Sequence, residues 1–464
     1  MGLCKGEKKL NFLDNLKNIN TVKQILSILG IDKPIFYTIL SVFWASIAGI
    51  LSIVFIIDFL SLSDQGYWYT FLSLGALATF AELGFTTIIT QFISHEYAYL
   101  QMENGKLSGD INRIYSTISL VKFSFKFYFI ITTLAFIILS FVGVVFLTTT
   151  TNNVYLLFAW VFYSFTGAFM LLVSLFGAVL RGLNKVAIAQ KIILIASVAS
   201  NIAIWAALYY GFNLWALGLG GIINIIFSLY LFFLAETSLW SQIFRSKIKK
   251  QDHWFKETLP LQWRYAISWA SGYFIFQFIV PVALIYAGAD VAGKLGLSLV
   301  IARAVQTLAN SWGSTKIPQL NIFVEQKKRD NLDILLKTIQ KQSLLVFLAG
   351  SIILILILIY IFPRIGWDTR VLPTYEIAII LIAEGGNLVV FNWAYYLRSH
   401  KEEPYMRLSA VSALGIGITV WASFFLFASS LIALISYCVV VLIMLIPAWR
   451  IFVKKSKEYN KTWN

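Results

Sequence analysis

The stretch QGYWYTFLSLGALATFAELGFTTIITQFISHE, residues 65–96, decides the fold class of this chain. Between Gly66 and Ile93 only one residue, Glu82, carries a formal charge. A helix needs roughly 20 consecutive, mostly apolar residues to cross the hydrocarbon core of a bilayer. The stretch is long enough, and we therefore predict that it spans a membrane.

The composition of the whole chain agrees with this prediction. Of its 464 residues, 59% are hydrophobic and 13% are charged, whereas a soluble domain has about 45–50% apolar and about 25% charged residues. The mean hydropathy is +0.77. The chain is therefore predicted to be an all-α integral membrane protein.

We predict about twelve membrane-spanning helices of this kind. A polar, Lys-rich segment of 34 residues precedes them and lacks the early apolar core of a cleavable signal peptide. Residues 11–30 of this segment have apolar side chains at helical spacing, so they either lie along the membrane surface or form a solvated tail. The predicted spans are residues 35–57, 66–93, 118–147, 154–180, 187–210, 215–235, 261–287, 293–318, 343–362, 375–397, 405–427 and 431–449.

The distribution of Lys and Arg predicts the orientation of the chain. If the N-terminus is cytoplasmic, the terminal segments and connections on that side contain 27 of these residues, and the opposite connections contain only Arg364 and Arg370. Basic residues accumulate on the cytoplasmic side of membrane proteins. We therefore expect both termini to be cytoplasmic, and the net charge of +15 implies no nucleic-acid partner.

Several classes of function do not fit the sequence. The two cysteines, Cys4 and Cys438, and the three histidines are too scattered to predict a disulfide framework, a metal site or a catalytic cluster. No GxxxxGK[ST] phosphate-binding motif is present, and all connections between spans are short. We therefore expect no cofactor and no ATP-driven pump.

The two halves of the chain look like copies of one unit. DQGYWYTFLSL (residues 64–74) enters the second span and DVAGKLGLSL (residues 290–299) enters the eighth, and Leu-Arg pairs end the fourth and tenth spans. Six spans in each half make the repeat parallel and predict two six-helix lobes. The expected division is a cytoplasmic N-terminal segment (1–34), an N-lobe (35–235), a cytoplasmic linker (236–260), a C-lobe (261–449) and a basic tail (450–464).

Two stretches resemble a known family. Residues 65–96 resemble the second-span signature of bacterial polysaccharide flippases, the Wzx-type exporters of O-antigen and capsule in the multidrug/oligosaccharidyl-lipid/polysaccharide (MOP) superfamily. LFGAVLRGLNKVAIAQ (residues 175–190) is similar to the connection between the fourth and fifth spans of that family. With the twelve spans and short loops, the resemblance extends over nearly the full chain. It implies two helical lobes around a cavity that opens alternately to each side.

The resemblance also implies a function. The chain would be a transporter of the bacterial cytoplasmic (inner) membrane, not an enzyme, and its cargo an oligosaccharide repeat unit linked to undecaprenyl pyrophosphate. The cargo would serve O-antigen, lipopolysaccharide, capsule or other surface-polysaccharide synthesis. Further implied partners are membrane lipids, a coupling proton or sodium ion, and a polysaccharide polymerase that uses the product. A monomer is expected.

Two other functions remain open as alternatives. A small-molecule or drug antiporter of the same superfamily needs an acidic cavity to bind organic cations. A membrane polysaccharide polymerase or glycosyltransferase needs a large outer loop with catalytic residues, whereas the longest outer segment here is residues 362–375.

Arg303 is the first candidate site residue. It follows Gly293 by ten residues in the eighth predicted span, which places it about 15 Å along the helix and close to the bilayer centre. Placing an arginine at that depth raises the free energy of inserting the helix into the membrane by about 2.5–3.5 kcal/mol. It is expected either to bind an anionic headgroup of the cargo or to form a salt bridge between helices. One helix face, which we expect to line a cavity, carries Gly296, Arg303, Gln306, Thr307, Asn310 and Ser314.

Two carboxylates lie deep inside predicted spans, away from the span ends. Glu82, near the middle of the second span, is the expected counter-charge of Arg303, because the second and eighth spans are repeat partners that would face each other. Glu384 lies nine residues into the tenth span. Each is expected to act as a coupling group or as a structural counter-charge.

Further basic residues are candidates for an electrostatic path toward the centre. A pyrophosphate loses hydration on entering the cavity, and cationic side chains would offset that loss. Such residues also commonly extend to the membrane surface without binding a ligand. The candidates for binding cargo beside Arg303 and Asn310 are Lys122, Lys126, Arg264, Lys294 and Lys316.

Overall fold

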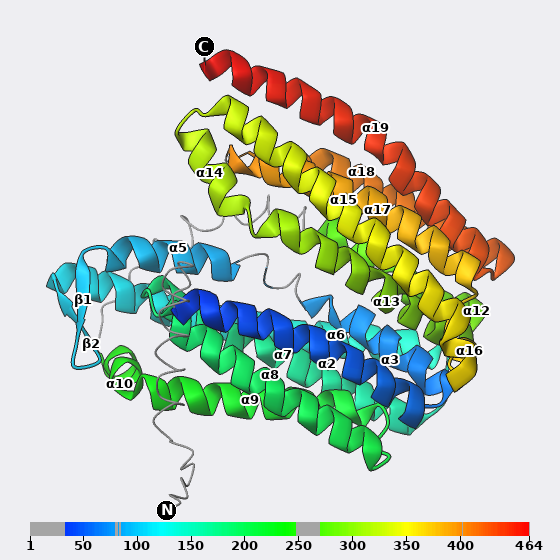
Figure 1. Ribbon diagram of the computed structural model, residues 1–464. Helices are drawn as coiled ribbons and strands as arrows, with labels where there is room; N and C mark the ends of the chain where they lie inside the picture. Colours follow the sequence, from blue (N-terminus) through cyan, green and yellow to red (C-terminus); the bar gives the residue numbers. More distant parts are fainter. Residues whose placement is uncertain (1–32, 79–81, 83–84, 247–269, 401, 464) are drawn as a thin grey trace, which may run out of the picture.

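The computed structural model describes residues 33–78, 82, 85–246, 270–400 and 402–463, and in this part nearly all regular structure is helical. One group of helices forms the N-lobe, the lower half of Figure 1. Its elements are α2 (Lys33–Phe59), α3 (Leu62–Gly75), α5 (Phe85–Tyr97), β1 (Leu100–Glu103), β2 (Lys106–Gly109), α6 (Ile111–Thr148), α7 (Val154–Gly182), α8 (Val186–Tyr209), α9 (Trp215–Ala235) and α10 (Thr237–Arg245).

A second group forms the C-lobe, the upper half of Figure 1. It begins with a helical segment, Ala270–Phe276. Its other elements are α12 (Ile279–Ala287), α13 (Ala289–Ser314), α14 (Ile317–Glu325), α15 (Arg329–Tyr360), α16 (Phe362–Ile365), η1 (Asp368–Arg370), α17 (Thr374–Ser399), α18 (Met406–Phe427) and α19 (Ser430–Trp463). The predicted all-α fold with two helical lobes is confirmed.

The number of spans is close to the number predicted. Within the described residues, ten helices are long and apolar enough to cross a membrane, and a bent pair, Ala270–Phe276 with Ile279–Ala287, makes eleven. The remaining predicted span, residues 66–93, is divided between α3 and α5. Neither of these helices is long enough alone. A turn at residues 76–77 follows α3, Glu82 is helical, and residues 79–81 and 83–84 lie outside the described residues.

The bend in the seventh predicted span has a local cause. Its two helical segments meet at 47°. Pro281 has no backbone N–H, so the carbonyl of Gln277, four residues earlier, loses its helical partner. The break between the segments falls at Gln277, so Pro281 marks the bend.

The lobes meet where α3 packs against α13 and α12, which we call the closed end. Glycines allow this contact: a Cβ on Gly66 would lie 2.0 Å from the carbonyl oxygen of Ala289. A Cβ on Gly293 would lie 2.8 Å from a backbone oxygen of α3. The side chain of Gln65 crosses between the lobes and donates to the carbonyls of Gly293 (2.9 Å) and Arg370 (3.0 Å).

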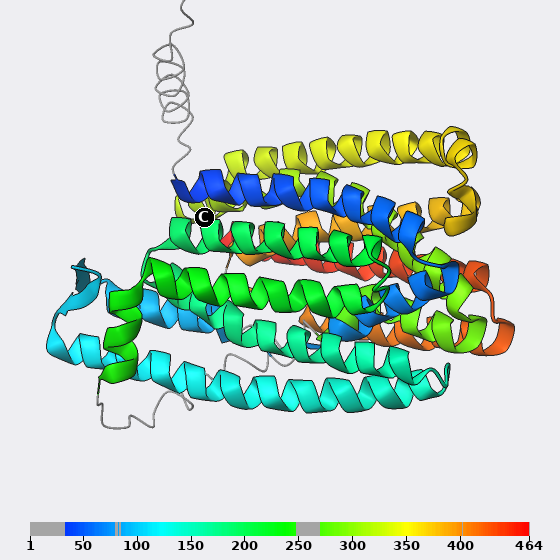
Figure 2. The same ribbon diagram turned by 90° about the horizontal axis from the view of Figure 1, so that it is seen from below.

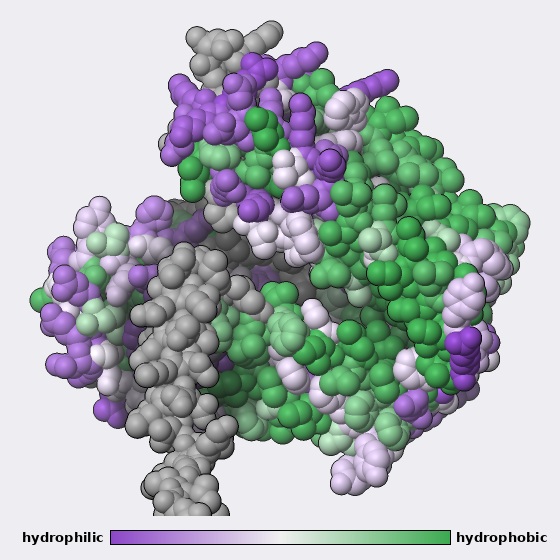
Figure 3. Space-filling model, viewed as in Figure 1, coloured by the Kyte–Doolittle hydropathy of each residue, from purple (hydrophilic) through white to green (hydrophobic). Residues whose placement is uncertain are grey.

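The lobes diverge toward α5 and α14, which we call the open end (Figure 1). The surface is hollowed between them there, and hydrophilic residues gather on that side of the molecule (Figure 3). A broad apolar surface covers the rest of this face, and α6 and α15 expose large side chains such as Phe141 and Ile352. Such a belt is expected where helices face lipid.

Two charged segments outside the predicted lobes form helix. Part of the expected linker, residues 236–260, is the amphipathic helix α10, which packs through Leu239, Trp240 and Ile243 beside the β1–β2 hairpin (Figure 2). Residues 450–463, expected as a basic tail, continue α19. The predicted surface helix at residues 11–30 lies outside the described residues.

Candidate functional site

Arg303 forms an ion pair inside the C-lobe. Its Nε donates to Oε1 of Glu384 on α17 at 3.0 Å. The side chain of Glu384 is 1% exposed and that of Arg303 is 22% exposed. Because a lone charge is costly at this depth, the pairing explains how α13 tolerates an arginine near its middle.

The carboxylate of Glu384 is held by two further side chains. Asn387, one turn along α17, donates its amide to Oε2 at 3.0 Å. The hydroxyl of Tyr437 on α19 lies 3.3 Å from Oε1 and accepts a bond from Asn387 at 3.0 Å. The group links α13, α17 and α19 and fixes Glu384 as the counter-charge of Arg303.

Arg303 also stabilises the bend before α12. Its Nη1 donates to the backbone carbonyl of Phe276, and the guanidinium lies 5.6 Å from the centre of the Phe276 ring. The last carbonyls of a helix have no intrahelical partner, and Phe276 ends the segment that precedes the bend. Within the described residues, the buried Nη2 of Arg303 has no hydrogen-bond partner.

The predicted cavity face of α13 is in fact two faces. Residues seven apart in sequence lie on the same side of a helix, and one such series begins at Gly293, which packs on α3. Farther along this side, Val300 is 40% exposed, and Thr307 and Ser314 are also exposed. The side that touches the N-lobe at the closed end therefore lines the hollow farther along. Its residues there are small or hydroxylated.

The second face of α13 packs on α17 and does not line the hollow. Asn310 accepts a hydrogen bond from the Tyr395 hydroxyl at 3.1 Å, and Gln306 is buried. A Cβ on Gly313 would lie 2.8 Å from Oδ1 of Asn392 on α17. The expectation that Gln306 faces a cavity is wrong, whereas Asn310 is partly buried and its role in binding stays a prediction. Arg303 lies at the boundary between the two faces.

The predicted pairing of Glu82 with Arg303 is also wrong. Glu82 accepts a hydrogen bond from the Tyr128 hydroxyl of α6 at 3.3 Å, and its charge interacts with Arg181 of α7. Both partners belong to the N-lobe. The lobes touch through the other end of α3, so the repeat symmetry does not bring Glu82 to Arg303.

Two of the predicted basic residues lie on α6. Lys122 donates to the backbone carbonyls of Phe244 and Ser246 at the end of α10. Helix C-termini have unpaired carbonyls and a partial negative charge, so Lys122 caps α10 here, and its role as a cargo contact stays a prediction. Lys126, one turn farther, is exposed.

The other basic candidates are dispersed. Lys294 follows Gly293 at the closed end and is partly buried, while Lys316 is exposed in the connection between α13 and α14. Lys294 and Arg303 are nine residues apart, about 13 Å along α13. Arg264 lies outside the described residues. The structure therefore does not gather these cations into one cluster.

Sequence reasoning missed Phe276, Tyr437 and Tyr128 as partners of the charged groups. Phe276 contributes a backbone carbonyl, and the two tyrosines are among many in apolar helices, so no motif marks them. Asn387 had a visible signal, because it follows Glu384 by three residues and such residues share a helix face.

No protein-family model matches this sequence, and no curated relative matches it. Solved structures do share its fold. A multidrug resistance MATE family transporter of the MOP superfamily, in an inward-facing conformation, has a TM-score of 0.59 at 12% identity over 90% of this chain and 99% of its own. A MATE family transporter in an outward-facing conformation has a TM-score of 0.54 at 12% identity, over 93% of this chain and 97% of its own. The lipid II flippase MurJ, in an inward closed conformation, has a TM-score of 0.62 at 13% identity, over 92% of this chain and 91% of its own. The chain therefore has the two-lobe helical fold of MOP transporters.

Proposed function

We propose that the protein is a flippase that moves an oligosaccharide linked to undecaprenyl pyrophosphate across the bacterial cytoplasmic membrane by alternating access. The fold it shares with a lipid II flippase and with MATE transporters supports a transporter. Its product on the outer leaflet would be used by a polysaccharide polymerase. No step in this function changes a covalent bond.

The hydrogen bonding of Arg303 is the observation that most supports a lipid-linked, anionic cargo. The Arg303 side chain is 22% exposed, and after its bonds to Glu384 and Phe276 its buried Nη2 has no partner among the described residues. Arginine binds phosphate oxygens through a planar fork of donors and stays charged in an apolar site. The small, hydroxylated side of α13 beside it, with Thr307 and Ser314, would face the sugars.

In this proposal the open end faces the cytoplasm. The excess of basic residues on that side supports the assignment. Glu82 is the better candidate for a coupling proton or sodium ion, because three side chains already hold Glu384.

A drug exporter is the second candidate, because MATE transporters share the fold equally. The observation that favours it is the internal neutralisation of Arg303 by Glu384, which leaves no net positive charge at the pair. Glu82 in the other lobe would then attract an organic cation.

The test uses the purified protein in proteoliposomes with two probes, a fluorescent undecaprenyl-pyrophosphate oligosaccharide and ethidium. We expect translocation of the lipid by the wild type, partial activity in Arg303→Lys and none in Arg303→Ala. The double variant Arg303→Ala/Glu384→Gln removes both charges, and we expect it to stay inactive because the phosphate contact is still missing. Restored activity would assign Arg303 a structural role only. Transport of ethidium without the lipid would establish the drug exporter.

A further inference from the structure

The last four turns of α19 extend beyond the membrane. The helix Ser430–Trp463 has 34 residues, about 51 Å at 1.5 Å per residue, against about 30 Å of hydrocarbon. Its apolar run ends near Trp449. We call residues 450–463 the α19 extension, and its first turns must lie at the level of the lipid headgroups.

One face of the α19 extension packs on the C-lobe. Phe452 stacks on Trp393 with ring centres 5.7 Å apart, and Ser456 lies 3.3 Å from the hydroxyl of Tyr396. Lys455 on the same side pairs with Glu402 at 2.8 Å. These contacts fix the rotation of the helix, and with it the direction of the opposite face.

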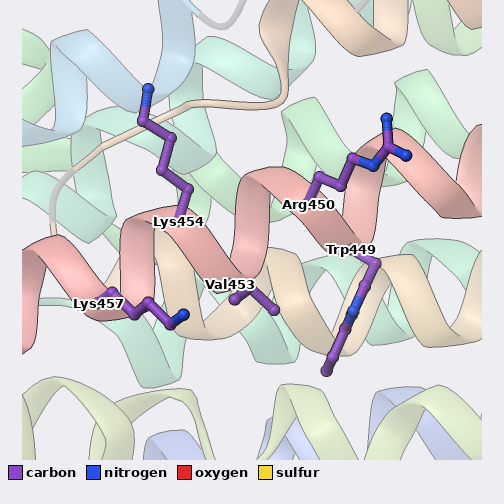
Figure 4. A pocket seen from close by; sticks show the side chains of 5 residues that line it. All are labelled: Trp449, Arg450, Val453, Lys454 and Lys457. Atoms are coloured by element: carbon purple, nitrogen blue, oxygen red, sulfur yellow. The ribbon is translucent and has the colours of Figure 1, made fainter.

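The opposite face is basic. Arg450, Lys454 and Lys457 are exposed, and none of them forms an ion pair with a carboxylate in the part of the chain that the structure describes. Together with Trp449 and Val453 they line a hollow of about 380 Å³. Figure 4 shows Arg450 and Lys454 on one side of the helix, Trp449 and Val453 on the other, and Lys457 extending along the helix between them.

This arrangement is unfavourable without a ligand. The three cations follow one another at spacings of four and three residues, and like charges at those spacings repel each other on a helix. An anion among them would relieve the repulsion. Trp449 adds an apolar surface: it is 50% exposed, and its ring is held 5.3 Å from that of Trp393. Tryptophan prefers the boundary between hydrocarbon and headgroups.

We propose that the basic face of the α19 extension binds the phosphate headgroup of an anionic phospholipid in the adjoining leaflet. The acyl chains would lie along the apolar part of α19, with Trp449 at the glycerol level. Basic clusters directly after a membrane span attract anionic lipids. This site lies on the outer side of α19, whereas the proposed cargo site is between the lobes, so it is separate from the proposed function.

The experiment measures lipid binding to the purified full chain by native mass spectrometry, with phosphatidylglycerol and phosphatidylcholine as probes. We expect the wild type to prefer phosphatidylglycerol. In the triple variant Arg450→Gln/Lys454→Gln/Lys457→Gln we expect affinity for phosphatidylglycerol to fall about 100-fold, since each basic residue contributes about five-fold. The charge-preserving variant Arg450→Lys/Lys454→Arg/Lys457→Arg should bind within about two-fold of the wild type.

A matched control removes three exposed lysines elsewhere, as Lys328→Gln/Lys337→Gln/Lys341→Gln. We expect it to keep wild-type affinity, and an equal loss there would show unspecific attraction by net charge and overturn the proposal. Equal binding of phosphatidylcholine would overturn it too. Displacement of the lipid by millimolar inorganic phosphate would show a site for a free anion instead. Size-exclusion chromatography of each variant verifies that it is folded.

Discussion

The ion pair of Arg303 and Glu384 makes the sharpest prediction of the structure. Glu384→Gln removes the charge that balances the guanidinium, although the Gln amide can still accept a bond from Asn387. Breaking a buried pair by removing one partner costs about 3–5 kcal/mol. Because Arg303 is 22% exposed, water can partly compensate it, and we expect a loss of about 3 kcal/mol in the free energy of unfolding.

The opposite single change should cost more. Arg303→Gln leaves the carboxylate of Glu384, 1% exposed, without its counter-charge, and it also removes the bond to the carbonyl of Phe276. We expect a loss near 5 kcal/mol. The double variant buries no unpaired charge, so its loss should fall short of the sum of the single losses by about 3 kcal/mol.

The assay is a double-mutant cycle on reversible unfolding in mixed micelles of rising sodium dodecyl sulfate content. Glu82→Gln is the matched control, because Glu82 contacts Tyr128 in the other lobe. The loss in the free energy of unfolding caused by Glu82→Gln should add to the loss caused by Arg303→Gln, with a deviation of no more than about 0.5 kcal/mol. Coupling of Arg303 to Glu82 with none to Glu384 would refute the pairing and restore the arrangement expected from the sequence repeat.

Two further predictions concern the closed end and the C-terminal end of α19. In Gly66→Leu, the new Cβ would lie 2.0 Å from the carbonyl oxygen of Ala289, so the two lobes must separate there. Distances between spin labels on the two lobes at the closed end should therefore increase. The control Gly49→Leu, whose Cβ would have no atom within 4 Å, should leave these distances unchanged. Burial lowers the pKa of His400, which stacks on Tyr459, and the bond from Lys455 lowers the pKa of Glu402. Both groups therefore stabilise the docked α19 extension above their ordinary pKa values of 6.5 and 4.5. The protection of that segment against hydrogen exchange, after division by the intrinsic exchange rate at each pH, should fall as the pH drops below each value. Protection that does not change with pH would contradict this.

The helices could be predicted because each depends on a property of its own segment. Hydropathy alone locates spans such as α7 and α15, since a lipid-exposed segment must be apolar and must satisfy its own backbone. Pro281 located a bend for the same reason: the lost hydrogen bond is local. What hydropathy could not show is the division of the second span between α3 and α5.

The partners of the charges could not be predicted, because they depend on which helices touch. Two carboxylates deep within predicted spans, Glu82 and Glu384, were possible partners of Arg303, and the sequence repeat favoured the wrong one. Packing of α13 on α17 within one lobe decides the matter. The α19 extension was missed for another reason. Its charges predict a solvated tail, although Phe452, Ser456 and Tyr459 recur at helical spacing.

The position of the pair on α13 bears on how the two lobes can exchange conformations. α13 holds α3 of the N-lobe through glycines at its start and holds α17 of its own lobe through Arg303. Separating the closed end breaks only the first contact, so the Arg303–Glu384 pair can travel with the C-lobe intact. A charge that stays paired in this way would avoid the cost of exposure inside the membrane. In the proposed flippase, an anionic cargo that gains a bond from Nη2 would add to this pair without replacing Glu384, so its affinity would stay low enough for release on the far side.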